Sequence, residues 1–313
     1  MSSRRRSLAT LLALYVVLSF CLFCCATSCR RHERQPNSRL VADDMGRKVW
    51  VAQAPKRLIS LAPSVTEILF ALGLGDRVVG VTTYCDYPAD AAAIEKVGDT
   101  QKPNLEKIIS LKPDLVVIST ASQLEEFVGN LENLGVPVYV NNPTDLRSLL
   151  DSIQRIADVA GVAESGRTLV NDLRSRVEEV HTRVAGLDRP RVLLVLGSEP
   201  LITAGGGTFI SDLITEAGGE SISADQKTDY PLFSLETALA RRPEVIFLQA
   251  GGERLPNQFS DSPAVRAGRV YQLEDAILLR PGPRIVNGLE QVARKLHPEA
   301  FPMSLVKELP EHL

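Results

Sequence analysis

The chain has 313 residues, of which 44% are hydrophobic, and its formal net charge is −3. This composition is sufficient for two core-bearing lobes and excludes an intrinsically disordered chain. No basic stripe is interleaved with aromatic residues, so we expect no nucleic-acid partner.

The N-terminus has the form of an export signal. Three arginines at positions 4–6 precede an apolar run over residues 8–23, and small residues close the run. This order is typical of a signal peptide, here residues 1–28. A membrane-spanning anchor is the alternative, because the apolar run is nearly long enough. The letters "ATSC", ending at Cys29, resemble a bacterial lipobox, so we expect Cys29 to be lipidated after cleavage.

Residues 29–56 are predicted to form a lipidated tether and a lead-in segment. The tether begins with "RRHERQPNSR", which is polar throughout. Beyond Cys29 the only cysteine is Cys85, so the exported fold has no internal disulfide to rely on.

Strand and helix patterns alternate over residues 57–162. "RLISLA", "RVVGVT", "PDLVVIS" and "VPVYVN" are short apolar runs of the kind found in buried strands. Ser64, with Glu67 three residues later, predicts a capping box for the helix after the first of these runs. The alternation predicts an N-terminal α/β lobe with a mostly parallel sheet.

A helical stretch follows and contains no strand. Apolar residues spaced four, four, three and four apart form one stripe, namely Leu169, Leu173, Val177, Val180 and Val184. We predict a helix from about Glu164 to Ala185 and assign residues 163–188 as a rigid linking helix.

Alternation resumes over residues 189–298, which predicts a C-terminal α/β lobe, and residues 299–313 form a polar tail. "TAGGGTF" at residues 203–209 lacks the Gly-Lys-Ser/Thr ending of a phosphate loop. We therefore interpret it as a tight strand-to-helix turn, whose bare glycine backbone would allow a ligand to approach.

One unit of sequence occurs twice. "NLEKIISLKPDLVV" begins at Asn104 and "SLETALARRPEVIF" begins at Ser234, an offset of 234 − 104 = 130 residues. In each copy a proline stands seven residues after the glutamate, which is Glu106 in the first and Glu236 in the second. The repeat indicates that the two lobes share one construction.

Two interpretations of Glu106 and Glu236 stay open from chemistry alone. A carboxylate in the first turn of a helix gains about 0.3–1 kcal/mol from the helix dipole, so both could serve local stability. Alternatively, paired lobes could present paired negative side chains to a basic partner.

These motifs, with "YCDYP" and "RPGPRIVNGLE", resemble the periplasmic binding proteins of ABC importers for vitamin B12, iron-siderophores and haem. The resemblance extends from about Arg57 to Pro298 and is nearest to the vitamin-B12-binding proteins. It implies two three-layer α/β lobes with mostly parallel sheets, joined by one long helix, with a ligand cleft between them. It also implies that Glu106 and Glu236 dock onto arginines of the permease.

Five residues are predicted to contact the ligand: Tyr84, Asp86, Tyr230, Asp275 and Arg280. A large, partly apolar and amide-fringed ligand needs flat aromatic faces and a few polar anchors. Tyr84 and Arg280 match ligand-contacting positions of the family. Tyr230 stands near a tryptophan position of the B12-binding proteins, and Asp86 and Asp275 lie in the same two loops as Tyr84 and Arg280.

The resemblance implies a lipid-anchored, exported binding protein that captures cobalamin or another corrinoid and delivers it to a permease. We expect a monomer with no cofactor of its own. The sole tryptophan, Trp50, precedes the first core strand, so a ferric siderophore or haem is an open alternative as the ligand.

An extracytoplasmic α/β enzyme is the third hypothesis. The four histidines lie outside the predicted cleft loops, and no G-x-S-x-G motif occurs, so Cys85 is the remaining candidate nucleophile.

Overall fold

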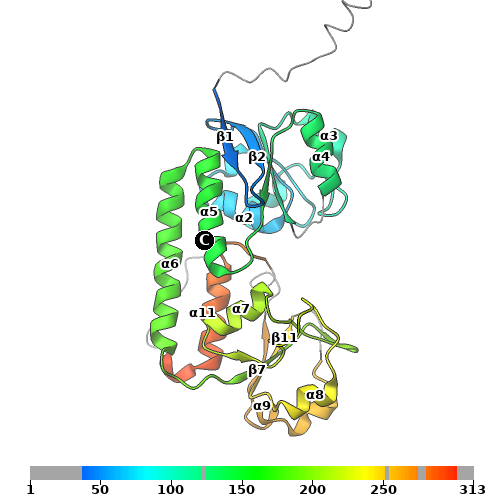
Figure 1. Ribbon diagram of the computed structural model, residues 1–313, viewed down its shortest axis with the longest axis vertical. Helices are drawn as coiled ribbons and strands as arrows, with labels where there is room; N and C mark the ends of the chain where they lie inside the picture. Colours follow the sequence, from blue (N-terminus) through cyan, green and yellow to red (C-terminus); the bar gives the residue numbers. More distant parts are fainter. Residues whose placement is uncertain (1–36, 121–124, 251–253, 274–279, 302–313) are drawn as a thin grey trace, which may run out of the picture. The chain divides into compact units, whose positions relative to one another are not determined.

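The first elements form a hairpin. The structure is a computed structural model, and it describes residues 37–120, 125–250, 254–273 and 280–301. Strands β1 (Ser38–Ala42) and β2 (Lys48–Ala52) pair as a two-stranded sheet (Figure 1). The predicted signal peptide, Cys29 and nearly all of the predicted polar tail lie outside the described residues.

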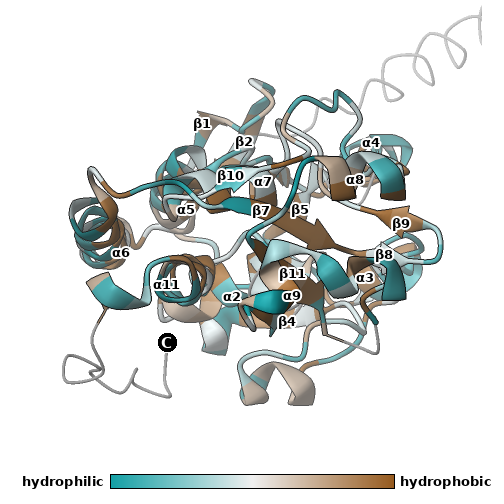
Figure 2. Cartoon of the chain, turned by 90° about the horizontal axis from the view of Figure 1, so that it is seen from below, coloured by the Kyte–Doolittle hydropathy of each residue, from teal (hydrophilic) through white to brown (hydrophobic). Residues whose placement is uncertain are grey.

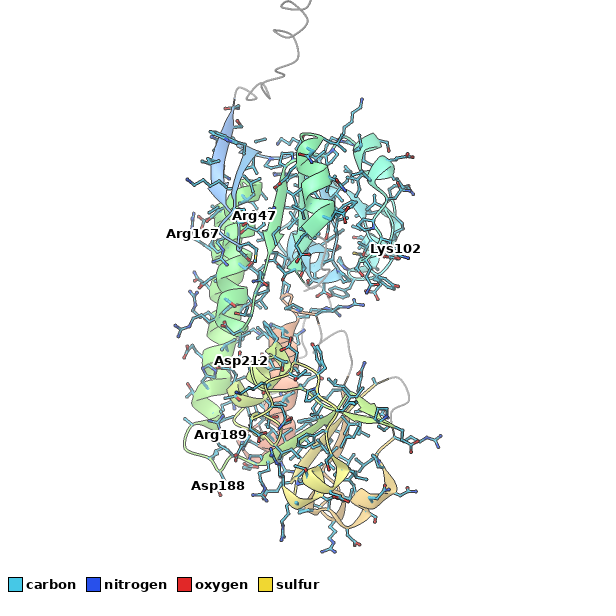
Figure 3. All side chains as sticks on the ribbon, turned by 45° about the vertical axis from the view of Figure 1, so that its right-hand side comes forward. Arg47, Lys102, Arg167, Asp188, Arg189 and Asp212 are labelled. Atoms are coloured by element: carbon cyan, nitrogen blue, oxygen red, sulfur yellow. The ribbon has the colours of Figure 1, made fainter. Side chains whose placement is uncertain are left out.

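Two adjacent carboxylates fix the turn of this hairpin. Asp43 accepts hydrogen bonds from the backbone and the guanidinium of Arg47, both at 2.8 Å. Asp44 accepts from Tyr139 at 2.8 Å and from Arg155 at 2.7 Å. Arg47, labelled in Figure 3, also donates to the carbonyl of Val138. The hairpin is therefore fastened to the strand that contains Val138 and Tyr139.

The N-terminal lobe is built on a four-stranded parallel sheet. Its strand order is β4-β3-β5-β6, with Leu58 opposite Leu115. These strands are β3 (Leu58–Ser60), β4 (Val78–Val81), β5 (Leu115–Ser119) and β6 (Val138–Asn141). β5 is buried along its whole length and carries hydrophobic colour in Figure 2. A strand buried on both faces belongs to a parallel sheet covered on both sides.

Short helices connect these strands: α2 (Pro63–Ala71), η1 (Gly75–Arg77), η2 (Ala89–Ala93), α3 (Leu105–Ser110) and α4 (Glu125–Asn133). The capping box predicted at Ser64 and Glu67 is wrong. The N-cap of α2 is Ala62, no side chain caps it, and Pro63 occupies the first turn. Proline is suited to that place because its missing N–H would have had no partner there. Glu67 instead points into the protein, as described below.

Two antiparallel helices follow β6. They are α5 (Leu146–Ala160) and α6 (Ala163–Val184). Asp145 and Ser148 form a capping box at the start of α5. Gly161 turns the chain in a left-handed conformation, and a Cβ there would lie 2.9 Å from the carbonyl oxygen of Gln53. The helix predicted from Glu164 to Ala185 is confirmed as α6, whereas the wider segment boundaries stay predictions.

The C-terminal lobe repeats the same construction. Its parallel sheet has the order β10-β7-β11-β12, and β8 pairs with β9 in a small hairpin. The strands are β7 (Arg191–Val195), β8 (Gly197–Ser198), β9 (Leu201–Ile202), β10 (Glu220–Ser221), β11 (Val245–Gln249) and β12 (Val270–Leu273). The helices are α7 (Phe209–Glu216), α8 (Leu235–Ala240), η4 (Asn257–Asp261), α9 (Pro263–Arg266), α11 (Ile285–Leu296) and η5 (Pro298–Ala300).

Both main sheets place the second strand, then the first, third and fourth, side by side. Each is a middle layer between two apolar layers. In β5, Val117 joins one buried cluster and Val116 joins another on the opposite face. In β7, Leu194 and Leu193 divide in the same way. The predicted fold class of two three-layer α/β lobes is confirmed.

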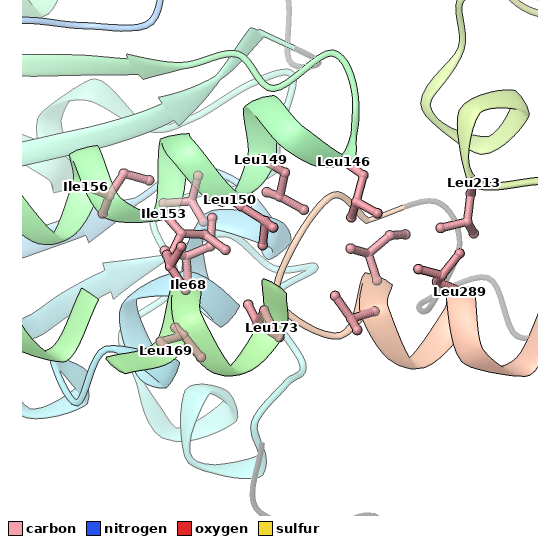
Figure 4. Close-up of a cluster of buried hydrophobic side chains, with 14 of the residues drawn as sticks. Ile68, Leu146, Leu149, Leu150, Ile153, Ile156, Leu169, Leu173, Leu213 and Leu289 are labelled. Carbon is pink, nitrogen blue, oxygen red and sulfur yellow. The ribbon is translucent and has the colours of Figure 1, made fainter. Parts of the chain in front are cut away.

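One buried cluster is common to both lobes. It runs from α2 through α5 and α6 to α7 and α11 (Figure 4). Leu149 lies on α5 and Leu173 on α6. Leu213 and Leu289 lie on α7 and α11 of the C-terminal lobe. Residues 39–313 form one compact unit. The lobes are thus joined by continuous side-chain packing as well as by α6.

None of the helices in the described part of the chain combines the length and the apolar character required to cross a membrane.

Candidate functional site

The loop after β4 alternates between exposed and buried side chains. Tyr84 is 57% exposed and Asp86 is exposed, whereas Cys85 between them is 1% exposed. The Cys85 sulfur lies 3.1 Å from each of the hydroxyls of Thr66 and Thr82. Cys85 therefore anchors the loop and turns its two neighbours outward. A thiol enclosed in this way is a poor nucleophile for an external substrate.

Asp86 pairs with Arg280, although 194 residues separate them in the chain. The Arg280 guanidinium donates to the two carboxylate oxygens of Asp86 at 2.5 and 3.3 Å. The hydrogen bonds from Arg280 hold the pKa of Asp86 below its ordinary value of 3.8. Two predicted ligand-binding residues are thus in contact, one from the N-terminal lobe and one from the segment leading into α11.

A buried ion pair lies beside this contact. Arg284 donates to the two oxygens of Glu67 at 3.0 and 2.6 Å, and the Glu67 side chain is only 2% exposed. Arg284 also lies 3.8 Å from the ring centroid of Tyr87, which is a cation–π distance. Arg280 reaches the same glutamate at 3.9 Å. The segment before α11 is therefore held to α2 and to the Tyr87 loop.

Burial acts against the charge of both members of this pair, but it sets the net pKa shift only at Glu67. Burial raises the pKa of Glu67, and the hydrogen bond and charge of Arg284 offset this only in part. Burial disfavours the charge of Arg284 as well, but the hydrogen bonds and charge of Glu67 outweigh it and raise the pKa of Arg284. Glu67 was not among the predicted site residues. The available signal was that Glu67 is the only charged residue in the apolar segment 63–75.

The second exposed tyrosine comes from the C-terminal lobe. Tyr230 is 57% exposed and Leu232 is 71% exposed, whereas Phe233 is buried. The backbone nitrogen of Phe233 donates to the carbonyl of Leu201 at 2.8 Å, and Leu232 forms a bridge with Ile202. The segment is thus held against β9, which leaves Tyr230 and Leu232 pointing outward. Asp275, the remaining predicted ligand contact, lies outside the described residues.

The glycine-rich turn contains two glycines that the fold itself requires, whereas the approach of a ligand to this turn stays a prediction. The turn itself is confirmed, and Thr208 caps α7 through a hydrogen bond from Ser211. A Cβ on Gly205 would lie 2.1 Å from the carbonyl oxygen of Thr228, and one on Gly206 would lie 2.0 Å from that of Ala224. The bare backbone therefore admits the neighbouring loop of the same chain, so close approach by a ligand is not what requires these glycines.

The two repeated glutamates occupy the same place in their lobes. Both are exposed in the first turn of a short helix, Glu106 on α3 and Glu236 on α8. Asn104 caps α3 and Ser234 caps α8, each by accepting a hydrogen bond from a backbone nitrogen three residues later. The predicted caps are confirmed. The role of the carboxylates stays a prediction.

The equivalence continues beyond these helices. Lys112 and Arg242, also 130 residues apart, both adopt left-handed backbone conformations, with φ of 47° and 48°. The acid two residues later then caps the first strand of its own lobe: Asp114 accepts from the backbone of Arg57, and Glu244 accepts from that of Arg191. Glu106 and Glu236 are therefore carried on two copies of one framework.

A family model described as periplasmic binding protein matches residues 58–276. The chain belongs to the periplasmic binding proteins. The vitamin B12-binding protein of Vibrio cholerae is 34% identical over 245 residues, which cover 77% of this chain and 89% of that protein. The corresponding protein of Yersinia pestis is 31% identical, with 78% and 88% of the two chains covered.

Solved structures agree with this periplasmic binding protein in fold. The periplasmic vitamin B12-binding protein of Vibrio cholerae matches with a TM-score of 0.71 and 33% identity, over 79% of this chain and 99% of that one. The periplasmic haem-binding protein of Roseiflexus sp. RS-1 has a TM-score of 0.69 and 27% identity, over 78% and 99%. The predicted family is confirmed.

Family membership makes this periplasmic binding protein an exported, periplasmic binder rather than an enzyme.

In the described part of the chain, no group of three or more His, Cys, Asp and Glu side chains could hold a metal ion. A pocket of about 450 Å³ lies in the C-terminal lobe, lined among others by Ser221, Asp225 and Arg241. Of the predicted ligand contacts that the structure describes, none lines this pocket.

Proposed function

We propose that this periplasmic binding protein captures cobalamin or a related corrinoid and delivers it to the permease of an ABC importer. The observation that carries the proposal is the likeness to proteins named for vitamin B12 binding, at 34% identity over 77% of the chain. The haem-binding structure of Roseiflexus sp. RS-1 covers nearly the same share of the chain at 27% identity.

The exposed side chains suit a corrinoid. A corrin is a large, partly apolar ring system fringed by amides, and it needs aromatic surfaces together with a few polar groups. Tyr84 and Tyr230 offer exposed rings on loops of different lobes. Asp86 and Arg280 offer both acceptors and donors for amides. We assign these four, with Asp275, as the ligand-binding residues.

A haem or a ferric siderophore is the second candidate ligand. Besides the Roseiflexus protein, a periplasmic haem-binding protein in complex with two haems matches with a TM-score of 0.71 and 28% identity. The sole tryptophan, Trp50, lies on the hairpin strand β2 and not on the loops that carry Tyr84 and Tyr230. The aromatic contacts to a corrin would therefore come from tyrosines.

Titration calorimetry against cyanocobalamin, cobinamide, haem and a ferric siderophore tests the proposal. We expect the tightest binding with a corrinoid and a loss of about fivefold or more for Tyr84→Ala and for Tyr230→Ala, since each removes a ring face worth at least 1 kcal/mol. Trp50→Ala is the matched control, because it removes another exposed aromatic ring and should leave affinity unchanged. A siderophore or haem bound more tightly than both corrinoids would reject the corrinoid assignment.

We also propose which residues attach this protein to the permease and to a membrane. We assign Glu106 and Glu236 as the carboxylates that dock onto the permease, supported by their equal placement on two copies of one framework. We also assign Cys29 as the lipidated residue that ties the protein to a membrane. Labelling cells with a clickable fatty acid tests the second assignment, because Cys29→Ala should abolish the label and Cys85→Ala should not.

A further inference from the structure

Four charges meet between the N-terminal lobe and the segment before α11. Glu67 and Asp86 supply two carboxylates, and Arg280 and Arg284 supply two guanidinium groups. Each guanidinium already has a carboxylate partner, at 2.6 Å for Arg284 and at 2.5 Å for Arg280. Among these described side chains the formal charge therefore sums to zero. Arg280, the predicted cationic anchor for ligand, is neutralised by the protein itself.

The two pairs differ in how readily a ligand could replace the carboxylate. The Glu67 side chain is 2% exposed, and its partner Arg284 lies over the ring of Tyr87. Removing one member of such a buried pair leaves an uncompensated charge, which is costly. The Asp86 side chain is 65% exposed and that of Arg280 is 24% exposed. The Asp86–Arg280 pair is thus the one that solvent and ligand can reach.

A ligand carboxylate that pairs with Arg280 must either displace Asp86 or share the guanidinium with it, and in both cases it meets electrostatic repulsion from the Asp86 carboxylate. A ligand with uncharged amides avoids this repulsion. An amide oxygen can accept from a free N–H of the guanidinium while Asp86 keeps its own bonds, because the guanidinium has five donors. An amide nitrogen can donate to the exposed carboxylate of Asp86. Discrimination of this kind works through a repulsive element.

We infer that Asp86 is a specificity-determining residue, which by occupying Arg280 selects large ring ligands with an uncharged amide fringe against rings with free carboxylates. The inference rests on the proposed function, since it names the class of ligand for the same site. It gives Asp86 a role different from that of a simple anchor. An anchor would strengthen binding of every ligand of the site, whereas this carboxylate disfavours one class.

The test compares Asp86→Asn with Asp90→Asn by titration calorimetry, using cyanocobalamin, haem and haem diamide. Asp90 is an exposed acid of the same loop region, so its replacement removes one equal charge without touching Arg280. We expect Asp86→Asn to tighten haem binding about fivefold, which corresponds to the upper range for a partly exposed ion pair. Cyanocobalamin and haem diamide should gain no affinity, because neither brings a ring carboxylate that Asp86 would repel. Asp90→Asn should change none of the three.

Each outcome decides the inference. An unchanged or weaker haem affinity in Asp86→Asn, or an equal gain for haem and haem diamide, would overturn it. An equal haem gain in Asp90→Asn would also overturn it, because general charge would then explain the effect. If the wild type fails to bind cyanocobalamin, the proposed function fails. If the wild type binds cyanocobalamin and Asp86→Asn gains nothing for haem, the inference fails alone, and if no variant binds any ligand, both fail.

Discussion

Asp44 shows how a single side chain fixes an element in place. Its carboxylate is 2% exposed and accepts hydrogen bonds from Tyr139, Arg155 and the backbone of Asn142, among others. Burial raises the pKa of Asp44, but the hydrogen bond from Arg155 and those from the other donors outweigh it, so the pKa lies below 3.8. The charged form is thus the one that the fold stabilises, and a neutral side chain cannot replace it.

Asp44→Ala is expected to lower the free energy of unfolding by about 3 kcal/mol at pH 7, because several buried donors lose their acceptor. The contribution of Asp44 should be fully present above its unfolded pKa and should disappear as the pH falls through its lower folded pKa. Urea denaturation at pH 7 and at pH 3 measures both effects, with Asp90→Asn as the exposed control. A loss of less than about 1 kcal/mol at pH 7 would show that the hairpin does not depend on this network.

Two glycines differ in whether the surrounding structure leaves room for a side chain. Gly206 faces the carbonyl oxygen of Ala224, whereas Gly129 lies inside α4 with no atom near its would-be Cβ. Gly206→Ala should therefore destabilise the fold by about 2 kcal/mol or more. Gly129→Ala should stabilise it by about 0.5–1 kcal/mol, since alanine favours a helix interior. Thermal unfolding of the two variants measures whether their stabilities change in opposite directions. A change in the same direction would contradict the difference in space around the two glycines.

At the scale of elements, α3 and α8 are the units that the two lobes duplicate. Each begins with a capping side chain, carries an exposed glutamate in its first turn and ends shortly before a left-handed residue. Local stability requires an acid near the helix start but not the same acid on both lobes. A shared role at the surface is the simpler explanation for two copies, and it requires both carboxylates to act together.

The double variant Glu106→Lys with Glu236→Lys should abolish uptake of the ligand by whole cells while leaving its affinity for the purified protein unchanged. Charge reversal would place like charges opposite the basic groups proposed for the permease. Asp172→Lys with Glu178→Lys is the matched control, because both are exposed acids on α6. Lost ligand affinity in the Glu106 and Glu236 variant would instead assign these residues to the fold or to the ligand site.

Sequence patterns were sufficient for most elements of the two lobes, but not for the β1–β2 hairpin or for the contacts that assemble the elements. The repeat at 130 residues predicted the shared construction of the lobes, because it reflects local caps, turns and strand patterns. The Glu67–Arg284 pair joins residues 217 apart, and no local pattern at either residue specifies the other. The capping box at Glu67 was wrong for the same reason, since Pro63 starts the helix and a distant arginine takes the carboxylate. The role of Asp44 was not predicted, because its hydrogen-bond partners lie about 95 residues or more away along the chain.

At the scale of the molecule, the lobes are not independent bodies on a flexible connection. The common buried cluster includes Leu150 of α5, Leu173 of α6, Leu213 of α7 and Leu289 of α11 (Figure 4). Asp212 of α7, labelled in Figure 3, also accepts a hydrogen bond from the backbone of Leu146 at the start of α5. Protein cores are close-packed and resist deformation, so we expect the lobes to close only slightly when ligand binds.

The continuous core also predicts that both lobes unfold together. Trp50 is the sole tryptophan and lies on the hairpin of the N-terminal lobe, so its fluorescence reports that lobe alone, whereas far-ultraviolet circular dichroism reports both. The two urea transitions should coincide, which is the usual test for a cooperative unit. Leu289→Ala, in the common cluster on α11 of the C-terminal lobe, should shift both midpoints together, because it removes about 2–5 kcal/mol from a core that the lobes share. A fluorescence midpoint that stays at its original value while the circular dichroism midpoint falls would show that the lobes are separate units, and large ligand-driven closure would then become admissible.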